Sequence, residues 1–330
     1  MNHTLKIFFL QLLTLYCIKI SCSGNQLLNI SAKQRDLYFT INKIHEKRIS
    51  EIKCEEYESI TRQLKTSEQC DHCVLFLMAN GQYVRKNEFP HMAAIGWIRD
   101  KNSSSIEYSC AGSLISEQWV LTSAHCTHND MGFPRFVKLG SNDLSNDSGE
   151  IIKIMNIIIH PEFNQPRLYH DIALLKLERA VEFKNNVKPA CLYRKFETAP
   201  DSVWATGWGS RRNDTYDPSN ELMKVKLQTI DNIRCSMEYG KTIAVPNGVS
   251  PSMICAGDTF NHWKSDTCQG DSGGPIQVFR YRNFDDSSLL FDIVGITSFG
   301  RSCATENIPG VYIRVSHYID WIEKIVWLNS

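Results

Sequence analysis

The chain has 330 residues, 36 basic and 36 acidic side chains, and a formal net charge of zero at pH 7. This length suits two domains or one large domain with an appended segment, and the balanced charge gives no indication of nucleic acid or an anionic membrane as a partner. The 12 cysteines indicate an oxidising compartment, unless they belong to metal motifs.

The first residues predict a secretory signal peptide. Residues 7–18 form an almost unbroken apolar run, and the small residues at 21–23 allow cleavage before Gly24. The alternative is a membrane anchor, but this run is shorter than the roughly 20 residues that span a bilayer, and Lys19 follows it at once. We therefore expect residues 1–23 to be removed, the mature protein to be secreted and extracellular, and no later stretch to span a membrane.

Removal of the signal peptide leaves an even number of cysteines, which suits disulfide bonds, because Cys17 and Cys22 are lost with it. Asn-x-Ser/Thr triplets are compatible with the secretory pathway, although such triplets are common by chance. The candidate glycosylation sites are Asn29, Asn102, Asn146 and Asn213.

Residues 24–77 are polar and charged, with few large apolar side chains. Such a segment cannot bury much apolar surface, so we interpret it as a pro-segment rather than an independently stable domain. Its cysteines are Cys54, Cys70 and Cys73. The last two have the spacing of half a zinc ribbon, but no second Cys-x-x-Cys follows, so disulfide bonding is the better interpretation.

From Met78 onward, short apolar or alternating runs are separated by Gly, Asn, Asp and Pro, which predicts many short β-strands. The clearest runs are residues 92–98, 111–115, 119–122, 136–139, 151–159, 172–177, 222–230, 275–279 and 291–298. A helical period appears only from Ser316 to Val326, with Ser316 as the expected N-cap. The sequence therefore predicts an all-β barrel or sandwich that is closed by one helix.

Three motifs carry residues that are suited to nucleophilic catalysis. Residues 268–275 read Cys-Gln-Gly-Asp-Ser-Gly-Gly-Pro, in which the glycines can hold Ser272 on a tight turn with its hydroxyl outward. His125 follows an apolar run, and Asp171 precedes another. Each motif alone is more often an ordinary loop, a structural histidine or a strand cap. Their occurrence together in the order His, Asp, Ser is a much more specific indication of nucleophilic catalysis.

These motifs resemble the trypsin/chymotrypsin family of serine proteases, which has its catalytic residues in this order. The resemblance covers about residues 78–330 and includes three further stretches, at 88–97, 206–209 and 309–316. It implies two six-stranded antiparallel β-barrels, with the site in the cleft between them.

The family chemistry assigns a role to each residue. Ser272 attacks the peptide carbonyl, while His125 takes its proton and later delivers it to the leaving amine. Asp171 orients the imidazole, and the backbone N–H groups of Gly270 and Ser272 bind the developing oxyanion. The resemblance implies neither a metal nor an organic cofactor.

The resemblance also predicts specificity. Asp266 stands six residues before the serine, where trypsin-like members place the acid at the base of the primary pocket, so we expect cleavage after Lys or Arg. Gly300 and Gly310 match the small residues of the pocket walls. Ser298 and Gly300 are expected to pair with the substrate backbone as an added strand.

Several disulfides follow from the same resemblance. Within the protease domain it implies the pairs Cys110–Cys126, Cys235–Cys255 and Cys268–Cys303. Another bridge common in the family is absent, because both of its positions are valine, at Val203 and Val278. Cys191 is expected to tether the catalytic domain to Cys54, Cys70 or Cys73, with the other two paired together.

The activation sequence departs from the family pattern. Family members are cut after Arg or Lys, whereas here the matching bond joins Leu77 to Met78. The new amino group at Met78 is expected to pair with Asp271 and shape the oxyanion hole. Cleavage after leucine occurs in snake-type members of the arthropod clip-domain group, which the chain also resembles at residues 54–57 and 88–92, although the pro-segment lacks the six cysteines of a clip domain.

We therefore expect a secreted zymogen of a serine endopeptidase that cleaves protein substrates in an extracellular cascade. Its expected partners are an activating protease that cuts after Leu77 and a protein inhibitor. One alternative is a catalytically silent homologue that binds or scaffolds, but His125, Asp171 and Ser272 are all present. The other is a venom or digestive protease, against which the pro-segment and the leucine favour controlled activation.

Overall fold

The computed structural model describes residues 47–65, 82–99, 105–146, 148–209, 219–259, 270–280, 290–300 and 308–328. The chain divides into two units, Met1–Arg48 and Ile49–Ser330, and the fold below is that of the second unit. The expected signal peptide lies outside the described residues. Within them, no helix is both long and apolar enough to cross a bilayer.

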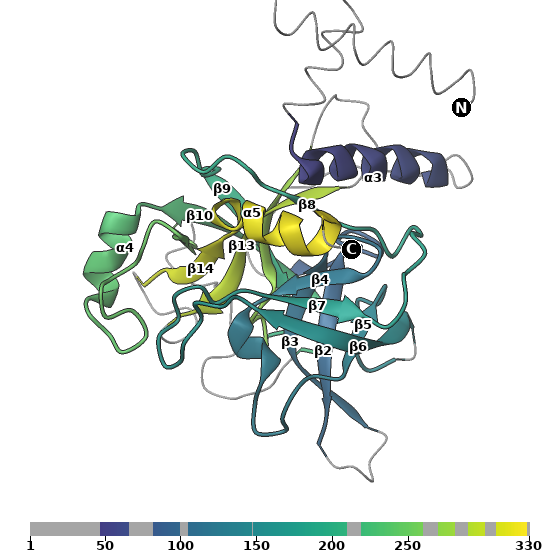
Figure 1. The fold of residues 1–330 in the computed structure, drawn as a ribbon, viewed down its shortest axis with the longest axis horizontal. Helices are drawn as coiled ribbons and strands as arrows, with labels where there is room; N and C mark the ends of the chain where they lie inside the picture. The colour runs from purple at the N-terminus through teal and green to yellow at the C-terminus, as the bar shows by residue number, and fades with distance from the viewer. Residues whose placement is uncertain are drawn as a thin grey trace, which may run out of the picture. The chain divides into compact units, whose positions relative to one another are not determined.

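Six antiparallel strands close the first barrel in the order β2-β3-β4-β7-β6-β5 (Figure 1). Their bounds are β2 (Met92–Ile98), β3 (Ile106–Leu114), β4 (Trp119–Thr122), β5 (Phe136–Leu139), β6 (Glu150–Ile159) and β7 (Ala173–Leu177). Alternate side chains of β2 enter two different cores. Ile95 and Trp97 fill this barrel, while Met92 and Ala94 pack against residues of the second barrel, so the strand reads as a continuous apolar run.

The second barrel is also closed by six antiparallel strands, because the path β10-β11-β14-β13-β12-β9 returns through the pairing of β9 with β10. The strands are β9 (Ser202–Gly207), β10 (Met223–Ile230), β11 (Met253–Gly257), β12 (Pro275–Phe279), β13 (Phe291–Phe299) and β14 (Gly310–Arg314). Two short strands extend this sheet, β1 (Gln82–Tyr83) on β10 and β8 (Cys191–Leu192), which is parallel to β13. Val203 and Val278, the two positions of the absent bridge, pack in the same apolar cluster, with Val203 buried and Val278 partly buried.

The predicted two-barrel fold and its C-terminal helix are thus confirmed, but the predicted start of the helix and its N-cap were wrong. A 3-10 turn (Val315–His317) precedes α5 (Ile319–Glu323), and a π-helical turn (Lys324–Leu328) follows it. Tyr318 occupies the N-cap position without a side-chain cap, so Ser316 does not cap the helix. Burial of Ile319 and Ile322 in a core shared by both barrels holds this segment instead.

Two further helices were not predicted. Helix α4 (Asn232–Tyr239) begins where the side chain of Asp231 accepts hydrogen bonds from the backbone N–H groups of Ile233 and Arg234, at 2.8 and 3.3 Å. Helix α3 (Ile49–Lys65) lies in the segment that we interpreted as a pro-segment. The described residues therefore contain α3 and α4 in addition to the predicted C-terminal helix.

Helix α3 packs against the rest of the second unit through covalent, apolar and ionic contacts. The disulfide Cys54–Cys191 joins it to β8, and Tyr57 packs edge-on against Phe183, with ring centroids 5.5 Å apart. Glu58 accepts a hydrogen bond from Nε of Arg280 at 2.6 Å. Because Cys54 and Tyr57 are both only 2% exposed, the helix belongs to the folded unit.

The ion pair of Glu58 with Arg280 should matter to stability. Glu58 is 5% exposed, and removing one partner of a buried pair costs about 3–5 kcal/mol, so we expect Glu58→Gln to lower the free energy of unfolding by about 2–4 kcal/mol. The lower figure reflects the second partner of Arg280, the carboxylate of Asp292 at 2.8 Å. Urea unfolding measures the difference.

The matched control is Glu56→Gln on the same helix. Glu56 pairs with Lys53 at 2.7 Å, but its side chain is 50% exposed, so its loss should change the unfolding free energy by less than about 1 kcal/mol. Equal effects of the two substitutions would contradict the docked position of α3.

A buried polar chain crosses the second core. Nε2 of His91 lies 2.5 Å from Oε1 of Gln277, whose Nε2 donates to the hydroxyl of Thr206 at 2.9 Å. Both His91 and Gln277 are buried, at 1% and 0% exposure. Burial lowers the pKa of His91 to about 3, and the hydrogen bond to Gln277 offsets this only in part. The imidazole is therefore neutral in the folded protein.

We predict that His91 contributes to acid unfolding. Its pKa is about 3 when folded and 6.5 when unfolded, so between these pH values the unfolded chain binds the extra proton and the unfolding free energy falls as pH falls. The slope from this group approaches about 1.4 kcal/mol per pH unit. His91→Gln keeps an N–H donor for Gln277 and should flatten that slope, as measured by urea unfolding at several pH values. Parallel slopes in the two proteins would contradict the prediction.

Candidate active site

The pairing of β4 with β7 brings His125 and Asp171 together. These strands are antiparallel, with Thr122 opposite Ala173, so the residues after the end of β4 face those before the start of β7. His125 lies there on a 3-10 turn (Ala124–Thr127), and Asp171 lies two residues before β7. The local pairing thus explains why two motifs that are separated by 46 positions meet.

The carboxylate of Asp171 is fully buried and accepts three hydrogen bonds. Its Oδ1 binds the backbone N–H of His125 at 2.8 Å, and its Oδ2 lies 2.7 Å from Nδ1 of the same residue. The hydroxyl of Ser298 donates to Oδ2 at 2.5 Å. A buried charge is tolerated when it is fully hydrogen-bonded, and these contacts meet that requirement.

The electrostatics of His125 follow from this contact. Burial of the ring disfavours its charged form, but the charge of Asp171 and its hydrogen bond to the ring outweigh burial, so the pKa of His125 is raised above its ordinary value. Because Nδ1 faces the carboxylate, Nε2 is the nitrogen left to exchange a proton with another group. The pair has the geometry of an oriented general base.

The loop that carries Ser272 packs against the strands that lead to His125. The backbone carbonyl of Ser272 accepts a hydrogen bond from the N–H of Ala111 at 2.8 Å. Gly273 has a φ of +76°, and a Cβ there would lie 2.2 Å from the hydroxyl of Thr122. Only glycine fits this conformation and this approach, which explains the glycine after the serine.

The same loop is also bound to β13. The N–H of Gly273 donates to the carbonyl of Thr297 at 2.9 Å, and the N–H of Thr297 donates to the carbonyl of Gly274 at 2.8 Å. Thr297 precedes Ser298, which contacts Asp171. Backbone and side-chain contacts therefore connect Ser272, through β13, with the His125–Asp171 pair. Gly270, two residues earlier, has a φ of +101°.

The side chain of Asp271 is enclosed by the stretch Thr-Gly-Trp-Gly at 206–209. Its Oδ1 accepts a hydrogen bond from the N–H of Gly209 at 2.8 Å. A Cβ at Gly207 would lie 1.9 Å from that oxygen, and one at Gly209 would lie 2.4 Å from Oδ2. These glycines let the backbone approach the carboxylate closely. Leu77 and Met78, the expected activation residues, lie outside the described residues.

The expected pocket residues are described in part. A Cβ at Gly300 would meet no described atom within 4 Å, whereas one at Gly310 would lie 2.9 Å from the hydroxyl of Tyr312. Asp266 lies outside the described residues. Sequence reasoning gave Ser298 a role toward the substrate backbone, but it missed the bond from its hydroxyl to Asp171, because no local pattern reveals a contact over 127 positions.

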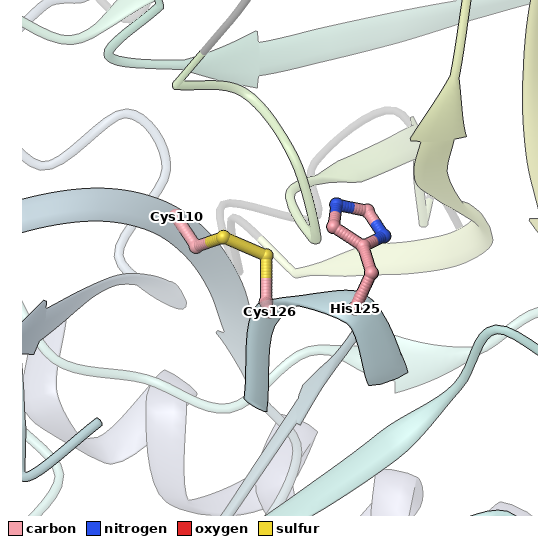
Figure 2. Close-up of side chains that lie close together, drawn as sticks. All are labelled: Cys110, His125 and Cys126. Carbon is pink, nitrogen blue, oxygen red and sulfur yellow. A yellow bond between two sulfur atoms is a disulfide. The ribbon is translucent and has the colours of Figure 1, made fainter. Parts of the chain in front are cut away.

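The disulfides in the described part of the chain include Cys110–Cys126 and Cys235–Cys255. Figure 2 shows the ring of His125 rising from the same turn as Cys126, beside the first of these bonds. The two sulfurs and a ring nitrogen of His125 lie within 4.8 Å of one another, but a disulfide offers no thiolate for a metal. Cys191 pairs with Cys54. The other expected partners, Cys70, Cys73, Cys268 and Cys303, lie outside the described residues.

One candidate glycosylation site, Asn146, is exposed on the first barrel. Its Nδ2 donates to Asp143 at 3.0 Å, and its Oδ1 accepts from the N–H of Ser148 at 2.9 Å. The other three triplets, at Asn29, Asn102 and Asn213, lie outside the described residues.

Comparison with known proteins agrees with this arrangement. The trypsin family model matches residues 78–322. Serine protease snk of Drosophila melanogaster is 40% identical over 292 residues, which cover 85% of this chain and 65% of that protein. Serine protease Hayan of the same organism is 34% identical over 259 residues, covering 76% of this chain and 39% of that protein. Mouse tryptase is 34% identical over 256 residues, covering 76% and 88%.

The chain thus spans less than two thirds of the length of each Drosophila relative. The match to the family model, however, extends over most of the chain and includes both barrels and the loop of Ser272. The chain belongs to the trypsin family.

Proposed function

We propose that this chain is the zymogen of a secreted serine endopeptidase that cleaves proteins after Lys or Arg in an extracellular cascade. The observation that carries the proposal is the buried carboxylate of Asp171, which binds both the backbone and the ring of His125. Membership of the trypsin family supports the same reaction, and the two Drosophila relatives are named serine proteases.

In the proposed reaction, Nε2 of His125 removes the proton from the hydroxyl of Ser272 as its oxygen attacks the peptide carbonyl. Asp171 keeps Nδ1 protonated and stabilises the imidazolium that forms. The N–H groups of Gly270 and Ser272 stabilise the oxyanion, and His125 then protonates the leaving amine. Water releases the acyl group by the reverse sequence of proton transfers.

Specificity in this proposal depends on Asp266. A carboxylate at the base of the primary pocket pairs with the cation of a Lys or Arg side chain, which a neutral side chain cannot do. Among the described residues, no atom lies within 4 Å of a Cβ placed at Gly300, which is compatible with entry of a long side chain. Ser298 is proposed to contribute twice, with its backbone toward the substrate and its hydroxyl toward Asp171.

Activation in this proposal follows from a cut after Leu77, made by a protease of different specificity. The new amino group of Met78 pairs with Asp271, next to Gly270, and so fixes the oxyanion hole. The bond between Cys54 and Cys191 keeps the pro-segment attached after the cut. We propose a protein inhibitor as a further partner of the cleaved form.

The role of Asp171 predicts a coupled loss of rate and change of pH profile. With an amide in place of the carboxylate, kcat should fall about 10³–10⁴-fold, because an amide N–H that donates to Nδ1 favours the tautomer in which Nε2 cannot accept the serine proton. Burial then acts alone on His125, so its pKa should fall and the acid limb of kcat/KM should move to lower pH. Hydrolysis of a peptide ester by Asp171→Asn between pH 5 and 9 measures both effects.

The control for charge is Asp201→Asn, an exposed aspartate of the second barrel, which should leave the profile unchanged. Ser272→Ala should abolish turnover. An unshifted acid limb in Asp171→Asn would show that the carboxylate does not set the pKa of the catalytic base.

Activation and specificity are tested together by replacing residues 74–77 with the recognition sequence of a site-specific protease that leaves Met78 as the N-terminus. The cut protein should hydrolyse Arg and Lys reporter peptides at least about 100-fold faster than Leu or Phe reporters. Asp266→Ser should remove that preference while the cut remains complete. A cut protein with no activity toward any reporter would favour the silent homologue instead.

A further inference from the structure

His160, Glu162 and His170 gather at one place on the first barrel, and His170 directly precedes Asp171 in the chain. The potential ligand atoms of the three residues all lie within 4.8 Å of one another. The pairing of β6 with β7 brings them together, because Ile159 lies opposite Ala173 and the segment between these strands folds back on itself. The cluster has no part in the proposed reaction.

The spacing of two of these groups fits a shared metal ion better than a hydrogen bond. Nε2 of His170 lies 3.4 Å from Oε2 of Glu162. Good N–H···O bonds are about 2.7–3.2 Å long. Two ligand atoms that each bind one tetrahedral Zn²⁺ at about 2.0–2.1 Å are about 3.4 Å apart.

The second ring nitrogen of His170 has a hydrogen-bond partner, as is usual for histidines that bind a metal through the other nitrogen. Its Nδ1 lies 3.1 Å from the hydroxyl of Tyr318, which is 3% exposed. A contact of this kind fixes the ring and directs Nε2 toward the ligand. The side chains of His170 and Glu162 are 28% and 68% exposed, so an ion can reach them from solvent.

His160 is placed to complete the site after a rotation of its side chain. Its ring is stacked on that of His170, with centroids 5.1 Å apart and planes 11° apart, so the nitrogen lone pairs of the two rings lie in nearly parallel planes and do not converge on one ion. To share an ion, His160 turns and gives up a long contact, at 3.3 Å, from the N–H of Glu162. The turn also changes its ring contacts with Tyr318 and Trp321, whose centroids lie 5.3 and 5.2 Å away. Two ligands are thus in position and the third is within reach.

We propose that His160, Glu162 and His170 form a site for Zn²⁺. Two imidazoles and one carboxylate are a common ligand set for zinc with an open fourth position, whereas Ca²⁺ and Mg²⁺ prefer all-oxygen sites. The other two clusters of potential ligands in the described residues contain cysteines that are bound in disulfides. The proposed site is the one whose donor atoms are free of covalent bonds.

The position of the site connects it with catalysis, and this part of the inference rests on the proposed function. His170 has a φ of +57°, and its carbonyl accepts a hydrogen bond from the N–H of Ile172 at 2.7 Å, so it shapes the turn that presents Asp171. A divalent cation one residue from Asp171 competes electrostatically with the imidazolium of His125. Bound zinc should therefore lower kcat and leave KM nearly unchanged.

The metal site is tested by titrating the full chain with zinc chloride in an isothermal calorimeter, in a buffer without chelators. Glu162→Gln is the first variant, because this exposed side chain can change without disturbing the core. It should weaken the zinc affinity at least about tenfold, and the double variant His160→Gln/His170→Gln should do the same or more. His128→Gln, an exposed histidine outside the cluster, is the matched control and should bind as the wild type does.

Equal zinc affinity in the wild type and in both cluster variants would place the metal elsewhere in the chain and overturn the proposal. Thermal unfolding in the presence of EDTA shows whether each variant is folded, and Glu162→Gln provides the decision if the double variant is not. Titration with magnesium chloride should give the same result for the wild type and for the cluster variants, because Mg²⁺ prefers all-oxygen sites.

The kinetic effect is measured on the cut protease with an Arg reporter peptide, with and without zinc. Zinc should lower kcat in the wild type and in His128→Gln but not in Glu162→Gln. Zinc binding without a change in kcat would overturn the connection with Asp171, while the metal site itself would still be supported. A cut wild type without activity even in EDTA would count against the proposed function, while calorimetry alone would still decide the metal site.

Discussion

The buried carboxylate of Asp171 is the constraint on which the site depends. An anion with no exposed surface needs donors on every side, and here they come from two barrels, His125 from the first and Ser298 from the second. The barrels must therefore be in contact before the charge is satisfied. Met92 and Ala94 of β2 supply that contact, because they pack in one cluster with Trp204, Trp208 and Phe291. The orientation of His125 therefore depends on the packing between the two barrels.

The short strands could be predicted from the sequence because each is an apolar run that is bounded by turn residues. Residues 92–98, 119–122 and 275–279 match β2, β4 and β12 residue for residue. The candidate catalytic residues were also recognisable, since the turn glycines beside Ser272 are needed by the backbone itself. Each of these features is determined by residues that lie only a few positions away in the sequence.

The features that were missed have distant causes. Helix α3 is mostly polar, and its stability depends on Cys191, Arg280 and other residues more than 130 positions away, which no window of sequence contains. The partner of Cys191 stayed open for the same reason, because three cysteines are equally available until the helix is placed. Helix α4 is only eight residues long, so its apolar period is too short to be separated from a loop.

The bond between Cys54 and Cys191 also bears on where an activated form would act. A covalent link keeps α3 at a high effective concentration beside its binding surface even when the ion pair of Glu58 opens transiently. Under the proposed function, a cut near Met78 therefore leaves α3 and the unit that carries Ser272 as one covalent molecule. A partner bound to α3 would then also hold the cut enzyme.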